Sequence, residues 1–179
     1  EIAVISLGGI VLNRSLRVAG DDFDEAVVTF LRLKYSLLVG IPTAEEVKIN
    51  LGSAYPVDKE EKHAVVRGRD LETGLPRSIK INAAEIREAL SPMITQIVSS
   101  ISDMLEETPP ELVSDIMNRG IVLCGGGSQI VGLDRRIAEE TKMPVWVADD
   151  PLTAVVRGTG RVLEEPELLK RVRVSGSLR

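Results

Sequence analysis

The sequence is poor in the residues that build covalent cross-links and metal centres. Its 179 residues include one cysteine, Cys124, and one histidine, His63. One cysteine excludes an intramolecular disulfide framework, and one cysteine with one histidine leaves too few soft ligands for a structural zinc site. We therefore expect a fold held together by its core, with Cys124 as a small buried hydrophobe and His63 as a surface residue.

Aromatic residues are also scarce, at 3% of the chain, so the 44% of hydrophobic residues predict an aliphatic core. No apolar run approaches the roughly 20 residues of a membrane-spanning helix. The net charge of -5 is opposite to the basic surface of a typical nucleic-acid-binding domain. The first residues lack the basic region and cleavage site of a signal peptide. They resemble the middle of a strand, which indicates a fragment of a longer protein.

Hydrophobic periodicity and turn residues predict strands and helices along the whole chain. The first predicted elements are strands at 2–7 and 10–18, a helix from Asp22 and a helix from Thr43 to about Leu51. Strands at 64–69 and 78–81 follow, and after them a long helix from Asn82 that reaches Leu105 and a short helix from Pro109 to Gly120. The last predicted elements are a strand at 121–124, a helix at 133–141, a strand at 145–148 and a helix from Pro151 to about Leu163. The final strand–helix–strand–helix order predicts parallel strands joined by a crossover helix.

Three predicted helices begin with a capping box, in which a polar N-cap residue is paired with a carboxylate three residues later. The pairs are Asp22 with Glu25, Thr43 with Glu46, and Asn82 with Glu85. Inside the third helix, Pro92 predicts a kink or a restart. Asp149 and Asp150 are interpreted as caps of the last helix ahead of Pro151, with a metal site as the less favoured alternative.

The order of elements predicts an α/β fold, with a mixed sheet flanked by helices and a small inserted α+β subdomain. Residues 1–40 and 83–179 would form the core subdomain, and residues 41–82 the insertion. Residues 59–62 are expected to form a charged surface turn. The basic cluster of Lys170, Arg171 and Arg173 is interpreted as part of a solvated terminus, with contact to anionic lipid as the alternative.

A run of three glycines is the first candidate for ligand binding. Gly125, Gly126 and Gly127 directly follow a predicted strand and precede a helix. Glycines at such a position let the backbone approach a ligand and present free N–H groups to it. The same residues could equally form only a tight turn between strand and helix.

Two further candidates lie at the starts of helices. Glu45 and Lys48 share one helix face, where they could contact a ribose or a purine, or form the more common surface ion pair. Gly20 lies before another helix, where a backbone N–H could meet a phosphate or ribose, or where the segment could simply cap the helix.

Several segments taken together resemble one family in order and spacing. They are Glu1–Val11, Arg17–Ala26, Thr43–Ala54, Arg67–Pro76, Thr108–Leu112, Gly120–Gly127 and Ala148–Thr153. The chain resembles the MreB family of bacterial actin-like, rod-shape-determining proteins over residues 1–163. The Arg-Gly-Arg-Asp and Thr-Gly-Leu-Pro motifs within Arg67–Pro76 favour this family over the heat-shock chaperone ATPases and sugar kinases of the same superfamily.

The resemblance implies an actin-like ATPase fold, related to ribonuclease H, in which two domains hold ATP or ADP with Mg²⁺ in a cleft. It implies that Gly125, Gly126 and Gly127 cradle the adenosine. It also implies that Glu45 and Lys48 contact ribose and base and that Gly20 lies near the ribose and phosphates.

The phosphate loops and the catalytic carboxylate of the family are missing from this sequence. The chain would therefore hold the adenosine side without catalysing phosphoryl transfer, which depends on those groups. We assign no catalytic residue and no metal ligand within it.

For the whole protein, the resemblance implies ATP-dependent filaments that organise cell-wall synthesis and maintain rod shape. It implies a cytoplasmic protein that touches the membrane only through its other half, with a RodZ-like membrane-anchored adaptor and cell-wall elongation proteins as partners. One alternative is a docking module for such an adaptor that works without nucleotide. An enzyme of the sugar-kinase branch is the least favoured hypothesis.

Overall fold

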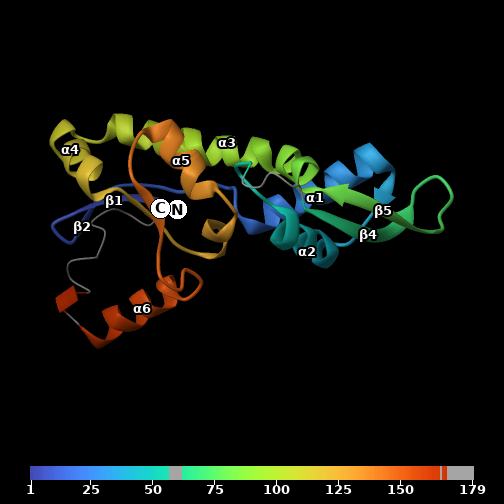
Figure 1. Cartoon of the computed structure of the whole chain (residues 1–179). Helices are drawn as coiled ribbons and strands as arrows, with labels where there is room; N and C mark the ends of the chain where they lie inside the picture. Colours follow the sequence, from blue (N-terminus) through green and yellow to red (C-terminus); the bar gives the residue numbers. More distant parts are fainter. Residues whose placement is uncertain (57–61, 166, 169–179) are drawn as a thin grey trace.

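The computed structural model of the chain describes residues 1–56, 62–165 and 167–168. Figure 1 shows an elongated molecule built along one long helix, α3 (Ala83–Glu107). Most of the predicted charged turn at 59–62 and the basic tail cluster from Lys170 to Arg173 lie outside the described residues. Within the described ranges, no helix combines the length and the apolar character that crossing a bilayer requires.

The chain begins with a hairpin of β1 (Ile2–Ser6) and β2 (Gly9–Arg14), which confirms the first two predicted strands with shorter bounds. Leu7 and Gly8 form the turn, and both have positive φ, at 51° and 78°. Such a turn twists in the same sense as the strands, and it suits glycine because a Cβ is disfavoured there.

The first two helices start earlier than their capping patterns predict. Helix α1 (Gly20–Tyr35) has Ala19 as its N-cap, and the Asp22 carboxylate accepts a hydrogen bond of 2.7 Å from the Ala19 N–H. Asp22 is therefore the carboxylate that reaches back to the cap, and its assignment as the cap itself, with Glu25 as its partner, is wrong.

Helix α2 (Ile41–Leu51) is capped by Gly40 and has Pro42 in its first turn, so the predicted cap at Thr43 is also wrong. Proline suits the first turn because its missing N–H would have no partner there.

One end of the molecule is a three-stranded antiparallel sheet packed on helices. Strands β3 (Leu37–Leu38), β4 (His63–Asp70) and β5 (Pro76–Asn82) lie in that order, with Val66 opposite Ile79. His63 is exposed, as the sequence predicts.

A single aliphatic core joins this sheet to α1, α2 and α3, with Phe23 as its one fully buried aromatic residue among those described. The predicted aliphatic core is therefore confirmed.

Helix α3 begins with the predicted capping box. The Glu85 N–H donates to Asn82 Oδ1 at 2.9 Å, and the Asn82 N–H donates to Glu85 Oε2 at 3.0 Å. The helix continues through Pro92 without the predicted restart. Leu90 and Ile94, on either side of the proline, are both buried in the same core, which stabilises the helix across the missing hydrogen bond.

The other end of the molecule contains shorter elements. They are α4 (Pro110–Arg119), β6 (Ile121–Leu123), the 3₁₀ turn η1 (Gly126–Gln129), α5 (Leu133–Thr141), β7 (Val145–Val147) and α6 (Ala154–Glu164). Strands β6 and β7 are parallel, which confirms the predicted crossover through α5. Among the described residues β6 pairs with β7 alone, so this sheet has two strands.

Two sequence predictions at this end are wrong. Cys124 is exposed, because the strand before it is covered on only part of its surface and Val122 is 55% exposed. Helix α6 begins at Ala154 with Thr153 as its N-cap, so Asp149 and Asp150 lie in the preceding turn and do not cap it directly. The Asp150 carboxylate instead accepts a hydrogen bond from the Thr153 hydroxyl.

Candidate functional site

Helices α1 and α2 meet where Lys48 of α2 contacts Gly20 of α1, two of the predicted site residues. We call this contact the α1–α2 corner. Lys48 Nζ donates a hydrogen bond of 3.2 Å to the backbone oxygen of Gly20. The same ammonium lies 2.8 Å from Oδ1 of Asp24, on the next turn of α1. A Cβ added at Gly20 would lie 3.7 Å from Lys48 Nζ, an ordinary van der Waals distance. The start of α1 and the middle of α2 are therefore joined by one lysine side chain.

Glu45 lies one turn before Lys48 on α2 and is exposed. Among the described residues, the ion-pair partner of Lys48 is Asp24 and not Glu45. The surface ion pair considered from the sequence is therefore not formed, and the Glu45 carboxylate points to solvent beside the corner. A carboxylate in that position can accept a hydrogen bond from a ligand hydroxyl.

The three glycines form a loop whose first residue, Gly125, is held by two hydrogen bonds. Gly125 has φ 85° and ψ 171°, its N–H donates to the backbone oxygen of Pro151 at 2.8 Å, and its own oxygen accepts from Ser128 Oγ at 2.7 Å. A Cβ at Gly127 would meet no atom within 4 Å, and one at Gly126 would meet only Leu152 at 3.3 Å. Packing within this chain therefore leaves open space beside the loop, as a ligand cradle requires.

The corner and the glycine loop are linked through the segment that follows α2. The Ala54 N–H donates to the backbone oxygen of Val131 at 2.8 Å, and Ser53 forms a parallel β-bridge with Val131. Val131 follows the glycine loop in the chain, so this contact fixes the end of α2 against that loop. The structure therefore brings Gly20 and Lys48 into contact, and it joins the segment after α2 to the segment after the glycine loop.

A cavity of about 320 Å³ lies elsewhere, between the segment after α2 and helices α3 and α5. Its lining includes Tyr55, Arg87, Ser91 and Arg136 and none of the six predicted residues. This cavity is therefore not part of the candidate site.

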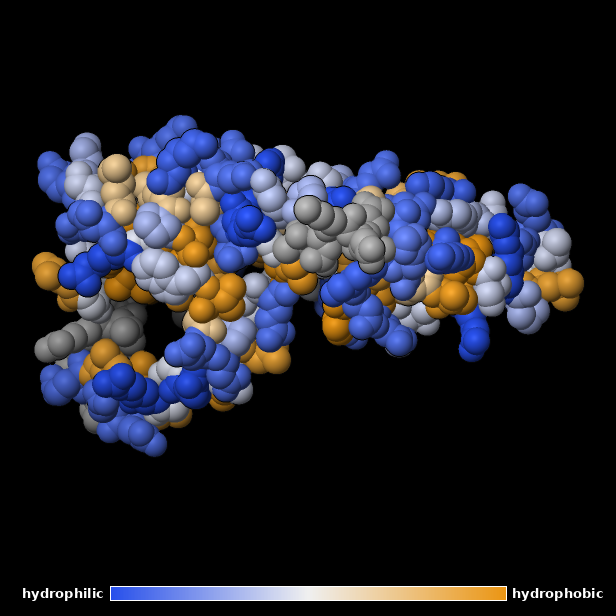
Figure 2. All heavy atoms as spheres, viewed as in Figure 1, coloured by the Kyte–Doolittle hydropathy of each residue, from blue (hydrophilic) through white to orange (hydrophobic). Residues whose placement is uncertain are grey.

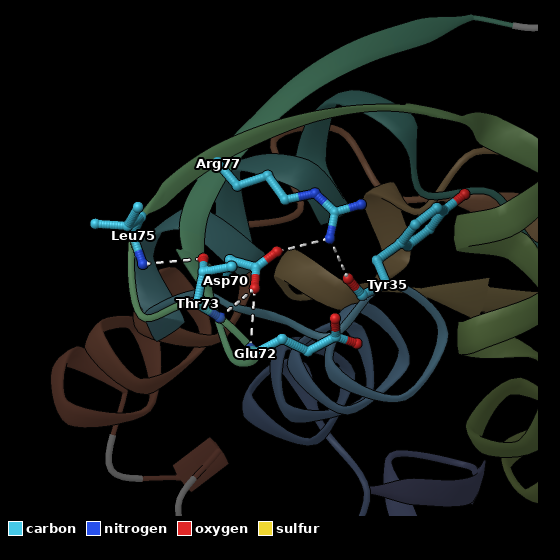
Figure 3. A network of polar contacts seen from close by, with 6 residues as sticks. All are labelled: Tyr35, Asp70, Glu72, Thr73, Leu75 and Arg77. Atoms are coloured by element: carbon cyan, nitrogen blue, oxygen red, sulfur yellow. Dashed lines mark hydrogen bonds and ion pairs between the residues drawn. The ribbon is translucent and has the colours of Figure 1, made fainter.

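A second polar network lies at the β4–β5 turn and has a structural role (Figure 3). Asp70 accepts hydrogen bonds of 2.9 Å from the N–H groups of Glu72 and Thr73, and Arg77 donates to it at 2.8 Å. Arg77 also donates to the backbone oxygen of Tyr35 at 3.1 Å. The Thr73 N–H, the Arg77 guanidinium and the Glu72 N–H lower the pKa of Asp70 from 3.8 to about 2. These bonds fix the turn and tie it to the end of α1.

The described residues do not bring together three or more His, Cys, Asp or Glu side chains as a metal site would.

Known proteins resemble this chain in both sequence and structure. The MreB/Mbl protein family model matches residues 1–171. The cell shape-determining protein MreB of Escherichia coli strain K12 is 52% identical over 164 residues, which are 92% of this chain and 47% of that protein. MreB5 of Spiroplasma citri, solved bound to ADP, superposes with a TM-score of 0.86 at 38% identity, over 90% of this chain and 49% of that one. MamK, solved as a double helical filament, gives 0.71 at 24% identity, over 84% of this chain and 46% of that one.

The chain therefore has the actin-like ATPase fold, which the likeness to MreB5 and MamK shows. Within that class, it belongs to the MreB/Mbl family. It spans about half the length of the relatives that it matches.

Sequence reasoning missed Asp24 as a residue of the corner. Asp24 lies on the same helical stripe as the buried Val27 and Leu31, three and seven residues later. A charged residue on an apolar stripe indicates a compensating partner inside the protein. That signal was present in the sequence, although it does not identify Lys48 as the partner.

Proposed function

We propose that the chain is the adenosine-binding half of an actin-like, ATP-dependent filament protein that organises cell-wall synthesis and maintains rod cell shape. The observation that carries the proposal is the membership of the MreB/Mbl family together with the α1–α2 corner, where Gly20 and Lys48 are in contact. MreB5 of Spiroplasma citri, which is 38% identical to this chain, has been solved bound to ADP and bound to AMPPNP.

Each part of the corner has a role in this proposal. Lys48 donates hydrogen bonds to the ribose hydroxyl groups and the edge of the base. The exposed Glu45 accepts hydrogen bonds from the same groups. Gly20 allows the sugar and phosphates to approach the start of α1, whose N-terminal N–H groups favour an anion. Gly125, Gly126 and Gly127 present backbone to the adenosine, because open space lies beside the loop.

The activity of a whole protein of this kind needs groups that the corner does not supply. We infer that ATP hydrolysis requires phosphate-binding and magnesium-binding residues outside this chain. Self-assembly into filaments is proposed for the whole protein, and MamK, which has the same fold, has been solved as a double helical filament. A membrane-anchored, RodZ-like adaptor and cell-wall elongation proteins are the proposed partners, with membrane contact through the other half and a cytoplasmic location.

The apolar side chains exposed at the β1–β2 and α6 end are compatible with a second domain packing there. They include Leu7 on the hairpin turn and Val155 and Val156 on α6. Figure 2 shows hydrophobic residues around the hollow beside α6. The comparisons do not favour the alternative of a docking module that works without nucleotide, because the relatives are cell shape-determining, actin-like proteins.

A titration of this chain with fluorescent ADP, with and without magnesium, tests the proposal. We expect weak, saturable binding that magnesium does not change and that Gly127→Val abolishes, because a side chain there would fill the space beside the loop. Gly158→Val is the matched control, since a Cβ at Gly158 on α6 also meets nothing within 4 Å. Absence of ADP binding by the unsubstituted chain would contradict the proposal that this chain binds adenosine. Equal losses of ADP affinity in both variants would show that the glycine loop has no special role.

A further inference from the structure

The α1–α2 corner contains a buried carboxylate for which the proposed nucleotide contacts give no role. Asp24 is 3% exposed, and it lies on α1 between the buried residues Phe23 and Val27. Burying a carboxylate is costly unless a cation compensates its charge. Lys48, on α2, supplies that cation at 2.8 Å, with 13% of its own side chain exposed.

The geometry of this pair leaves the lysine able to bind something else. The contact between Lys48 Nζ and Asp24 Oδ1 is close enough for an ion pair but is not aligned as a hydrogen bond. An ammonium has three N–H donors, and one is directed at the Gly20 oxygen at 3.2 Å. Donors of Lys48 therefore remain for an acceptor that arrives at the corner.

A lysine without such a partner would not stay in this position. Its four-carbon side chain is flexible, and its ammonium is strongly hydrated, so it moves to solvent unless a fixed charge holds it. The Gly20 oxygen is a neutral acceptor and attracts the ammonium less than a carboxylate does. The other carboxylate nearby on α2, Glu45, is exposed and would draw the ammonium away from Gly20.

We propose that Asp24 is a positioning residue of the nucleotide site, which holds the Lys48 ammonium beside Gly20 before the nucleotide binds. The inference rests on the proposed function, because it assumes that Lys48 contacts the nucleotide. Asp24 itself does not touch the ligand and acts only through Lys48. Holding the donor in place in advance removes the entropy cost of ordering a lysine when the ligand binds.

A double-mutant cycle in this chain tests the inference, with fluorescent ADP as the probe and circular dichroism to check folding. Asp24→Asn keeps the shape of the side chain and removes its charge, and we expect the affinity for ADP to fall about tenfold, as for the loss of one charge-assisted contact. Lys48→Gln should give a loss of the same size or larger. The double variant should bind no more weakly than Lys48→Gln alone, because Asp24 has no effect once its lysine is gone.

One further variant, Asp70→Asn, and the double variant keep the test decisive. Asp70→Asn removes a carboxylate from the ion pair with Arg77 at the β4–β5 turn, and it should leave ADP affinity unchanged. The double variant at Asp24 and Lys48 leaves no buried charge uncompensated, so it is expected to fold even if a single variant does not.

Each outcome either supports or overturns the inference. Additive losses in the double variant, or an affinity in Asp24→Asn equal to that of the unsubstituted chain, would overturn the positioning role alone. Failure of the unsubstituted chain to bind ADP would instead remove the proposed function, and this inference with it.

Discussion

The two ends of α3 differ in how completely they cover their apolar side chains. At the end with β3, β4 and β5, the sheet and helices α1 and α2 bury residues such as Leu31, Val66 and Ile81 almost completely. At the end with the β1–β2 hairpin and α6, large apolar residues such as Leu7 and Val155 are exposed. Exposed apolar side chains in such numbers indicate a surface made for contact with further protein.

The difference lies in the elements that cover each sheet. The sheet of β3, β4 and β5 has helices packed on it through one continuous core. Strands β1 and β2 form one two-stranded sheet and β6 and β7 another, and no residue of α6 is buried among those described. Two-stranded sheets are only marginally stable without further packing. More of the large apolar side chains are therefore exposed at the hairpin and α6 end than at the end with β3, β4 and β5.

The largest expected effect is on the free energy of unfolding, and it is tested with one leucine from each end. Leu31→Ala removes a side chain that is 0% exposed, and we expect the free energy of unfolding to fall by about 2–5 kcal/mol, as in other buried leucine truncations. Leu163→Ala, at a residue that is 78% exposed on α6, should change it by less than about 0.5 kcal/mol. Urea unfolding followed by circular dichroism measures both. Similar costs at the two positions would contradict the contrast between the ends.

A second prediction concerns the exposed surface of α6. Because Val155 and Val156 are both exposed, replacing both with serine should lower the binding of a hydrophobic fluorescent dye with little loss of stability. Val65→Ser is the matched control, since Val65 is a single exposed valine on β4. Equal losses of dye fluorescence in the two proteins would mean that α6 offers no special apolar surface.

The third prediction is a pH dependence that belongs to the compact end. The pKa of Asp70 is lowered from 3.8 to about 2, so its contribution to stability is complete above about pH 4 and is lost as the pH falls through about 2. Asp70→Asn should destabilise the chain near neutral pH and reduce the loss of stability between about pH 4 and 2. Thermal unfolding between pH 2 and 5 measures this loss. An equal loss in the variant would mean that other carboxylates cause it.

The smallest effect is expected for the ion pairs that tie the hairpin to α3. Arg14 contacts Asp103 at 3.2 Å and Glu107 at 2.6 Å, and both carboxylates are more than half exposed. Exposed pairs contribute about 0–1 kcal/mol, so Arg14→Gln should cost no more than that, and less in high salt. A salt-independent loss larger than this would show that the hairpin end is held more tightly than its burial indicates.

Much of the fold could be predicted from the sequence because local chemistry determined it. The turn at Gly8, the capping box of Asn82 and Glu85 and the crossover at α5 each depend on residues that are close in the chain. The division into a core subdomain of residues 1–40 and 83–179 and an inserted subdomain of residues 41–82 stays a prediction.

The errors had two causes, contacts between distant residues and an ambiguous local capping pattern. Cys124 is exposed because few elements cover its strand, and a local apolar pattern does not report how many neighbours a strand acquires. The start of α1 was placed late because Asp22 suits both the cap and the third helical position.

The candidate site was predictable in part. The sequence offers Gly20 and Lys48 as separate candidates. The structure places them in contact, which neither spacing nor periodicity indicates. Asp24 was missed because its partner lies on another helix, and a sequence alone does not identify which buried charges pair. The binding roles of Gly20, Glu45, Lys48 and the three glycines all stay predictions.

Helix α3 gives the molecule a mechanical property. It packs against α1, α2 and β5 at one end and against α5 at the other, and it is continuous over 25 residues. At about 1.5 Å per residue, such a helix is roughly 37 Å long. If α3 tilts as one body, a rotation of about 5° at one end displaces the other end by roughly 3 Å. A small movement at the α1–α2 corner would therefore reach the hairpin end as a displacement about as large as the separation of two hydrogen-bonded atoms.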